Sequence, residues 1–258
     1  MQSTIKDFCQ AIDLRQSRVV NGPQKITLFG GKTKNSDGST LSQRGTFLLS
    51  SPASSLPPDS FVVPEHYKNW NHFGTYDDLL SFEEDVCSLV DSVIVFLETE
   101  GAIAELGCLI KHEDIAPKLF VVVSNEYYQQ DSFIKLGPLL YLENIYSSNI
   151  HVSHGDTLNA EECRFIVEAV QERFNARHKT ETFRLNSIRH VLFLIVDFVD
   201  LLQVARISDI QALLQHLGIA YPKKRLEQLS AGAVIARLKE CWIDQRRESA
   251  SGTLLCVG

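Results

Sequence analysis

The 258-residue sequence lacks the marks of several common protein classes. Its six cysteines form no C-x-x-C pair, so the ligand spacing of a structural zinc site is absent. Its most apolar run, residues 191–196, is far shorter than the ~20 residues that a membrane-spanning helix needs. The N-terminal segment carries two acidic residues and no long apolar core, unlike a signal peptide. We therefore expect a cytoplasmic protein with reduced cysteines, no metal and no membrane contact.

Common catalytic motifs are also missing. The sequence contains neither the G-x-G-x-x-G dinucleotide fingerprint nor the phosphate-binding loop G-x-x-x-x-G-K-[ST]. It contains no G-x-S-x-G, which argues against an α/β-hydrolase.

Charge is distributed unevenly along the chain. The net charge is −7, from 25 Lys and Arg against 32 Asp and Glu. Residues 1–156 carry 11 basic and 20 acidic side chains, whereas residues 157–258 carry 14 and 12. The acidic total argues against a protein that coats nucleic acid along its whole length. Together with the length, the split predicts two domains, 1–156 and 157–258.

Apolar runs and helical patterns alternate in the first of these domains. Runs of strand length stand at residues 26–29, 61–63, 93–97, 119–123 and 150–152. They show little polar alternation, which is typical of parallel strands buried on both faces. Helical patterns lie between them, at 77–90, 102–111 and 138–145. The order predicts a doubly wound α/β domain of about five parallel strands, with its site at the carboxyl ends of the strands.

The second domain shows helical patterns and little strand signal. Helices are expected at 159–174, 185–202, 208–217, 222–229 and 231–242. Asn159 and Glu162 predict a capping box at the start of the first, and Gly218 predicts the end of the third. Residues 251–258 are compatible with a wing hairpin or a loose tail. We expect a small helical or winged-helix module.

The segment 91–107 is the most informative for chemistry. A buried strand ends just before Glu98, and Glu100 and Glu105 follow around Gly101. We expect Glu105 in the first turn or so of the next helix, where the helix dipole favours an ionised carboxylate. Such a group can act as a nucleophile or stabilise an oxocarbenium-like sugar carbon. The alternative is that these acids only stabilise the start of the helix.

Two other features are compatible with a ligand or with an ordinary structural role. Gly30-Gly31 either lets a ribose or phosphate approach the backbone or forms a tight turn. Phe133 either covers a ligand or packs as a hydrophobic staple under a loop. The residues alone do not decide between these readings.

Six motifs occur in the order found in a known family. They are Leu28-Phe29-Gly30-Gly31, Ser42-Gln43-Arg44, Val63-Pro64-Glu65, Leu80-Ser81-Phe82-Glu83, Glu98-x-x-Gly101-x-x-x-Glu105-Leu106-Gly107 and Ser132-Phe133-Ile134-x-x-Gly137-Pro138. The chain resembles the nucleoside deoxyribosyltransferase-like effectors of bacterial retrons over roughly residues 25–145. The last two motifs are the most specific, and the C-terminal half matches by architecture only.

This resemblance implies a flavodoxin-like domain that cleaves an N-glycosidic bond in NAD or a related nucleotide, without a cofactor. It implies Glu105 as the catalytic carboxylate, with a phosphate held by Arg44. The residues implied to bind substrate are Gly30, Gly31, Arg44, Glu65, Glu83, Glu98, Gly101 and Phe133. Glu84 and Glu100 replace an Asn and a Pro of the family pattern, so the site is more acidic. This favours a neutral or cationic group, such as nicotinamide ribose, nearest to it.

The resemblance also implies partners: a retron reverse transcriptase and its multicopy single-stranded DNA, which restrain a toxin until phage infection. Lys223, Lys224 and Arg225 fit contact with nucleic acid or this complex, although the acids among them are typical of a solvated helix face. One alternative is a non-catalytic nucleotide sensor with a nucleic-acid-binding tail. Another is a structural partner of the reverse transcriptase. The sequence does not decide whether the reaction is a hydrolysis or a transfer, or whether the protein forms a homo-oligomer or a higher assembly.

Overall fold

The computed structural model describes residues 7, 9–33, 42–66, 76–146, 149–202 and 205–238. The chain forms two compact units. The sheet unit comprises Gln24–Tyr67 and Val86–Arg177, and the helical unit comprises Met1–Pro23, Lys68–Asp85 and His178–Gly258. These units differ from the expected division at residue 157, because helix α7 (Ala160–Ala176) packs into the core of the sheet unit.

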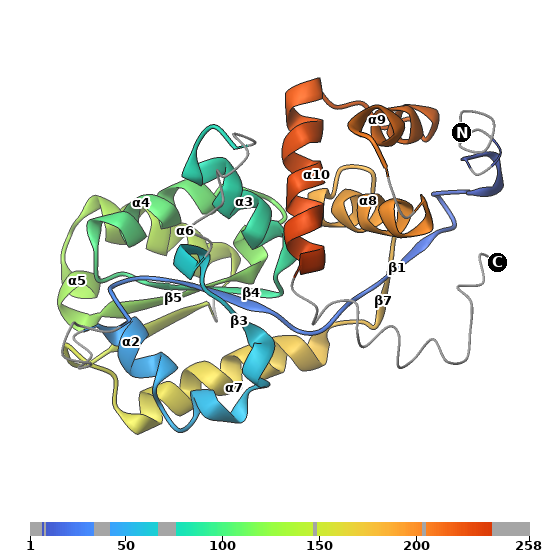
Figure 1. Cartoon of the computed structure of the whole chain (residues 1–258). Helices are drawn as coiled ribbons and strands as arrows, with labels where there is room; N and C mark the ends of the chain where they lie inside the picture. Colours follow the sequence, from blue (N-terminus) through green and yellow to red (C-terminus); the bar gives the residue numbers. More distant parts are fainter. Residues whose placement is uncertain are drawn as a thin grey trace. The chain divides into compact units, whose positions relative to one another are not determined.

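Five parallel strands form the centre of the sheet unit, in the spatial order β3-β2-β4-β5-β6 (Figure 1). They are β2 (Ile26–Phe29), β3 (Phe61–Val62), β4 (Ser92–Phe96), β5 (Leu119–Ser124) and β6 (Ile150–Ser153). Every neighbouring pair is parallel. Counted along the chain within this sheet, the order is 2-1-3-4-5, which is the flavodoxin-like arrangement. The prediction of a doubly wound α/β fold with about five parallel strands is confirmed.

Both faces of this sheet are covered, which explains why its strands are apolar without alternation. On one face, Ile94 and Phe96 belong to a buried cluster that includes residues of α2 (Gln43–Leu48) and α7. On the opposite face lies α4 (Glu100–Leu109), which buries Ala102, Leu106 and Leu109. Figure 1 shows α4 on one side of the sheet and α2 and α7 on the other.

Shorter elements connect the strands of the sheet unit. They are η1 (Ala53–Ser55), η2 (Pro58–Ser60), η3 (Pro64–His66), η4 (Ala116–Lys118), α5 (Asn125–Gln129), the π-helix η5 (Lys135–Leu139) and α6 (Leu140–Ile145). Helix α3 (Leu79–Leu89) begins in the helical unit and ends in the sheet unit. The sequence predicts Pro138 in the first turn of a helix. In the structure Pro138 lies inside η5 instead. The Asn159–Glu162 capping box at the start of α7 is confirmed.

The helical unit contains α8 (Ile188–Leu202), α9 (Ile207–His216) and α10 (Lys223–Leu238), and α10 packs against the other two. A short antiparallel pair, β1 (Arg18–Val20) with β7 (Thr180–Thr182), was not predicted. Gly218, at φ +79°, follows α9 as expected. Helix α10 runs through Ser230, where the sequence predicts a break between two helices; residues 239–242 of the second lie outside the described residues. The tail 251–258 lies outside the described residues.

Two further findings concern the ranges described above. Within them, no helix is both long enough and apolar enough to cross a membrane. Within the same ranges, no group of three or more His, Cys, Asp or Glu is arranged to hold a metal ion.

Candidate active site

The change in strand order between β2 and β4 marks the edge of the sheet where a ligand is expected. At such a point the chain leaves neighbouring strands in opposite directions, and a crevice opens beyond their carboxyl ends. Gly30 and Gly31 follow β2, and Glu98 follows β4. Helix α4 starts directly afterwards, with Thr99 as its N-cap. The structure therefore places several of the predicted site residues at this edge.

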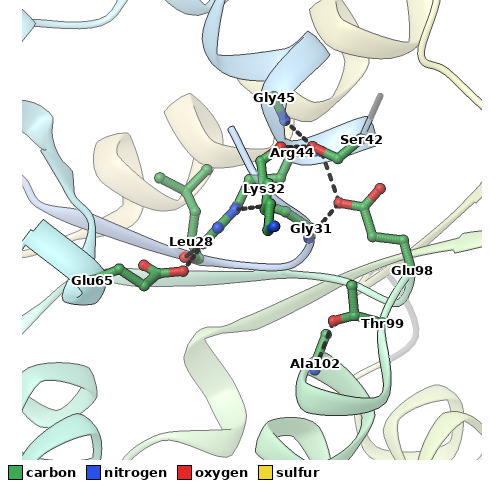
Figure 2. Close-up of polar contacts among 10 residues, drawn as sticks. All are labelled: Leu28, Gly31, Lys32, Ser42, Arg44, Gly45, Glu65, Glu98, Thr99 and Ala102. Atoms are coloured by element: carbon green, nitrogen blue, oxygen red, sulfur yellow. Dashed lines mark hydrogen bonds and ion pairs between the residues drawn. The ribbon is translucent and has the colours of Figure 1, made fainter. Parts of the chain in front are cut away.

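Glu98 anchors two main-chain segments to each other. Its Oε1 accepts hydrogen bonds from the backbone N–H of Gly31 at 2.8 Å and of Arg44 at 3.1 Å. Its Oε2 accepts one from the backbone N–H of Gln43 at 2.5 Å. Figure 2 shows the carboxylate between the Gly31 turn and the start of α2. Both oxygens accept hydrogen bonds from the protein's own main chain, and a substrate contact by Glu98 stays a prediction.

The two glycines after β2 are required by this close packing. Gly30 has a φ of +149°, and a Cβ there would lie 2.9 Å from both Glu98 Oε1 and Phe96 Cβ. A Cβ on Gly31 would lie 2.7 Å from Ser42 Cβ. The tight-turn reading thus accounts for both residues, and a nucleotide contact at Gly30 and Gly31 stays a prediction.

Arg44 is held inside the protein and is only 4% exposed. Its Nε donates to the carbonyl of Gly31 at 2.7 Å, and its Nη1 donates to the carbonyl of Leu28 at 3.1 Å. The same Nη1 forms an ion pair with Glu65 Oε1 at 2.6 Å (Figure 2). The Glu65 side chain, which follows β3, is 53% exposed. Nε and Nη1 of Arg44 thus take part in internal contacts, including a structural ion pair, and the phosphate contact of Arg44 stays a prediction.

Glu105 is half-buried in the second turn of α4. Burial raises the pKa of its carboxyl to about 7; the negative charge of Glu65 also raises it, whereas Arg44 lowers it. The sequence predicts an ionised carboxylate stabilised by the helix dipole, whereas in the structure burial makes the neutral form compete with the ionised form. The dipole acts within the first turn, and burial outweighs it. Glu105 therefore changes between its neutral and charged forms near pH 7.

The other residues predicted to bind substrate have varied surroundings. Gly101 is exposed at the start of α4, and a Cβ there would meet only Thr99 Oγ1, at 3.8 Å. Phe133 is 84% exposed, which excludes the staple reading, and its ring lies against Gly137. Glu83 is buried in the part of α3 that belongs to the helical unit. Substrate contacts by Gly101, Phe133 and Glu83 stay predictions.

One of the three basic residues predicted to contact nucleic acid is engaged within the helical unit. Arg225 binds Asp85 with two hydrogen bonds, of 2.6 and 2.9 Å. Asp85 is buried and also accepts a bond from the Tyr76 hydroxyl. Lys223 and Lys224 have side chains 79% and 61% exposed, each beside one acidic residue. The charge of Arg225 thus neutralises buried Asp85, and contact with nucleic acid or a partner stays a prediction for all three basic residues.

Two supporting side chains next to the site were missed by the sequence reasoning. Ser42 caps α2: its Oγ accepts from the N–H of Gly45 at 2.8 Å and donates to the Lys32 carbonyl at 2.6 Å (Figure 2). The Gln43 amide donates to Ser153 Oγ at 2.7 Å, which ties α2 to β6. A Ser before a helix is a readable start signal. The second contact joins residues 110 positions apart and leaves no trace in local spacing.

Fold and site together define a flavodoxin-like α/β protein with paired and buried charges at its switch point. The sequence profile of the family described as "STM3845 retron effector protein" matches residues 40–244, which is most of the chain. The chain belongs to this family of retron effectors.

Two Escherichia coli proteins are similar over shorter stretches. One, "Retron Ec73 putative ribosyltransferase/DNA-binding protein", is 30% identical over 78 residues, which cover 30% of this chain and 25% of that protein. Its counterpart from retron Ec86, with the same description, is 32% identical over 72 residues, covering 28% and 24%. The chain thus spans about a quarter of the length of each relative.

Proposed function

We propose that this retron effector cleaves the N-glycosidic bond of NAD or a related nucleotide during phage defence, with Glu105 as the catalytic carboxylate. The observation that carries the proposal is a half-buried carboxyl with a pKa of about 7 at the ligand edge of a flavodoxin-like sheet. Strongly shifted carboxyls in such positions are typical of reaction sites. The ribosyltransferase wording in the names of both relatives supports the same class of chemistry.

The chemistry centres on C1′ of the ribose. Ionised Glu105 attacks this carbon or stabilises its developing positive charge, and the C1′–N bond breaks with its electron pair leaving on the base. Water then adds its hydroxyl to C1′ and releases a proton, which frees the carboxylate. A base or protein side chain that takes the place of water would make the outcome a transfer instead of a hydrolysis.

The charge of the site favours NAD among nucleotides. The nicotinamide ring carries a positive charge in NAD and leaves as a neutral molecule, so its departure needs no proton donor. A cationic ring near Glu105 also lowers the pKa of this carboxyl and so favours its reactive form. A purine nucleotide would bring no such cation and would need a proton on its leaving base.

The test compares nucleotide pools in cells that express the wild type, Glu105→Gln or a control, Glu168→Gln, whose side chain is exposed on α7. Wild type and control should lower the NAD pool at least tenfold and release nicotinamide, and Glu105→Gln should leave the pool intact. Growth arrest by the wild type with all nucleotide pools unchanged would overturn the proposal and favour a non-catalytic nucleotide sensor. Full activity of Glu105→Gln would remove this residue from its role.

In the same proposal, a retron reverse transcriptase with its multicopy single-stranded DNA restrains the effector. Family membership and the DNA-binding wording in the names of the relatives support this partner. We assign this contact to Lys223 and Lys224 at the start of α10, whose side chains are exposed although each lies beside one acidic residue. Their double replacement by Glu should reduce co-purification with the complex, whereas exposed Lys179→Glu should not. Equal recovery of both variants would assign the two lysines to solvated surface.

A further inference from the structure

The exposed surface of η5 and α6 is mostly apolar. Four side chains of these two elements are exposed, and three of them are Leu136, Leu140 and Ile145. Phe133, just before η5, is 84% exposed, Leu136 is 59% exposed and Leu140 is 39% exposed. Their spacing of three and four residues places Phe133, Leu136 and Leu140 on one side of the helical segment. A row of exposed apolar side chains of this kind is typical of a site that binds another protein.

The two charged residues of η5 and α6 bind each other within the protein. Lys135 Nζ lies 3.3 Å from Glu143 Oε1 and 3.4 Å from the centre of the Tyr128 ring. The Tyr128 hydroxyl donates a hydrogen bond to the same carboxylate oxygen. Charged side chains are depleted from the centre of protein interfaces, because taking an unpaired charge out of water costs free energy. Since Lys135 and Glu143 neutralise each other, a partner can cover this surface without that cost.

The apolar side chains are arranged almost symmetrically about Leu136. Phe133 lies three positions before it and Leu140 lies four positions after it. We propose that this surface binds the same surface of a second copy of the chain, around a two-fold axis near Leu136. In such an interface the two helical segments run antiparallel, so that Phe133 of each copy packs against Leu140 of the other. This inference goes beyond the proposed function and does not depend on it.

Charges at the two ends of the segment favour a second copy over an unrelated partner. Asp131, which is exposed, lies five positions before Leu136. At the other end, exposed Lys111 places its Nζ 3.7 Å from the centre of the Tyr141 ring, and Tyr141 lies five positions after Leu136. Antiparallel packing therefore brings Asp131 of each copy toward Lys111 of the other. Opposite charges at opposite ends of an apolar centre give the self-complementary surface that a two-fold interface requires.

Sedimentation velocity of the full chain tests the apolar centre. The wild type should form dimers that dissociate on dilution within about 1–500 µM, the range of weak interfaces. Leu136→Asp places a carboxylate of each copy beside the axis and should weaken the dimer at least about tenfold. The matched control is Leu49→Asp, because Leu49 is 57% exposed in the same unit but lies outside η5 and α6. The control should dimerise like the wild type, and unchanged far-ultraviolet circular dichroism checks that both variants fold.

Exchange of the end charges tests the two-fold arrangement, at low ionic strength where exposed charges are least screened. Asp131→Lys and Lys111→Glu each place like charges opposite each other at two equivalent contacts. Each should therefore weaken the dimer by about tenfold. The double variant restores opposite charges in the reversed order, and its dissociation constant should return to within about threefold of the wild-type value.

The outcomes that overturn the inference are distinct from those that concern NAD cleavage. A wild type that stays monomeric over the whole range overturns it, and so does a dimer that Leu136→Asp leaves unchanged. Single charge reversals without effect, or a double variant without recovery, overturn the two-fold arrangement. If Leu136→Asp leaves the dimer intact but abolishes co-purification with the reverse transcriptase complex, the surface binds a different protein. Since none of these measurements uses NAD, failure of the proposed function leaves the inference standing.

Discussion

Replacement of Glu105 by Gln should stabilise the protein, and more so at high pH. The pKa of this carboxyl is about 7 in the folded chain, against an ordinary value of 4.5. The folded state therefore binds the proton more tightly than the unfolded state between these two values. The contribution of Glu105 to stability is therefore highest below pH 4.5, falls as the pH rises to about 7, and changes little above that. Gln carries no proton to lose, so the variant lacks this fall.

The size of the effect follows from the shift. A change from 4.5 to about 7 corresponds to about 3 kcal/mol at 1.36 kcal/mol per pKa unit. Since Glu105 is half-buried, solvent screening lowers the expected value to about 2 kcal/mol.

Urea unfolding at pH 5 and pH 8 measures this directly. Near pH 5 the wild-type carboxyl is mostly neutral and similar in shape to the amide, so Glu105→Gln and the wild type should have similar free energies of unfolding. At pH 8 the variant should be more stable by about 2 kcal/mol, with an unchanged m-value. Glu168→Gln, on the exposed face of α7, should show no pH-dependent difference. The same difference at both pH values would refute a raised pKa at Glu105.

Three further substitutions test the packing described above, each by urea unfolding at pH 7. Glu98→Gln places an amide among three main-chain donors and should cost about 2–3 kcal/mol; a loss under about 0.5 kcal/mol would contradict the anchoring role. Arg225→Ala leaves Asp85 buried without its charge partner and should cost about 3–5 kcal/mol, whereas exposed Lys223→Ala should stay within about 0.5 kcal/mol. Gly107→Ala adds a Cβ with nothing within 4 Å and should stabilise α4 by about 0.5–1 kcal/mol, so that any decrease would count against open space there.

The sheet could be predicted because its signals are local. Strands buried on both faces need continuous apolar runs, such as those at 93–97 and 119–123, and these runs coincide with β4 and β5 to within one residue. The β1–β7 pair gives no such signal, since each strand has three residues and its partner lies about 160 positions away. The division of the chain into two units also depends on contacts between distant segments, because α7 belongs to the core of the sheet unit. The apolar face of α7 is visible in the sequence, but the surface that it covers is not.

The sequence could predict which residues lie near this edge of the sheet, but not their charges or their hydrogen-bond partners. Glu105, Arg44, Glu65 and Glu98 all lie at or near the expected edge of the sheet, as their motifs suggest. Their charges and partners depend on segments that meet only in the fold. The Arg44–Glu65 contact spans 21 residues and the contact of Glu98 with Gly31 spans 67. Burial is the largest cause of the raised pKa of Glu105, and it cannot be predicted from the helix dipole or from the number of nearby acidic residues.

The carboxylates at this edge differ by what each one meets, and the difference constrains how a substrate can bind. Glu98 meets three backbone N–H groups and Glu65 meets a buried guanidinium, whereas burial is the largest cause acting on the pKa of Glu105 and the charge of Arg44 lowers it only in part. Three main-chain donors beside the Gly30-Gly31 turn, of the kind that can hold a phosphate, are thus already bound by Glu98. A dinucleotide in this scheme presents its ribose and cationic base to Glu105 and keeps its phosphates away from the Gly30-Gly31 turn. Glu98→Gln should therefore weaken folding without creating a preference for anionic substrates, because the amide still fills the space that a phosphate would need.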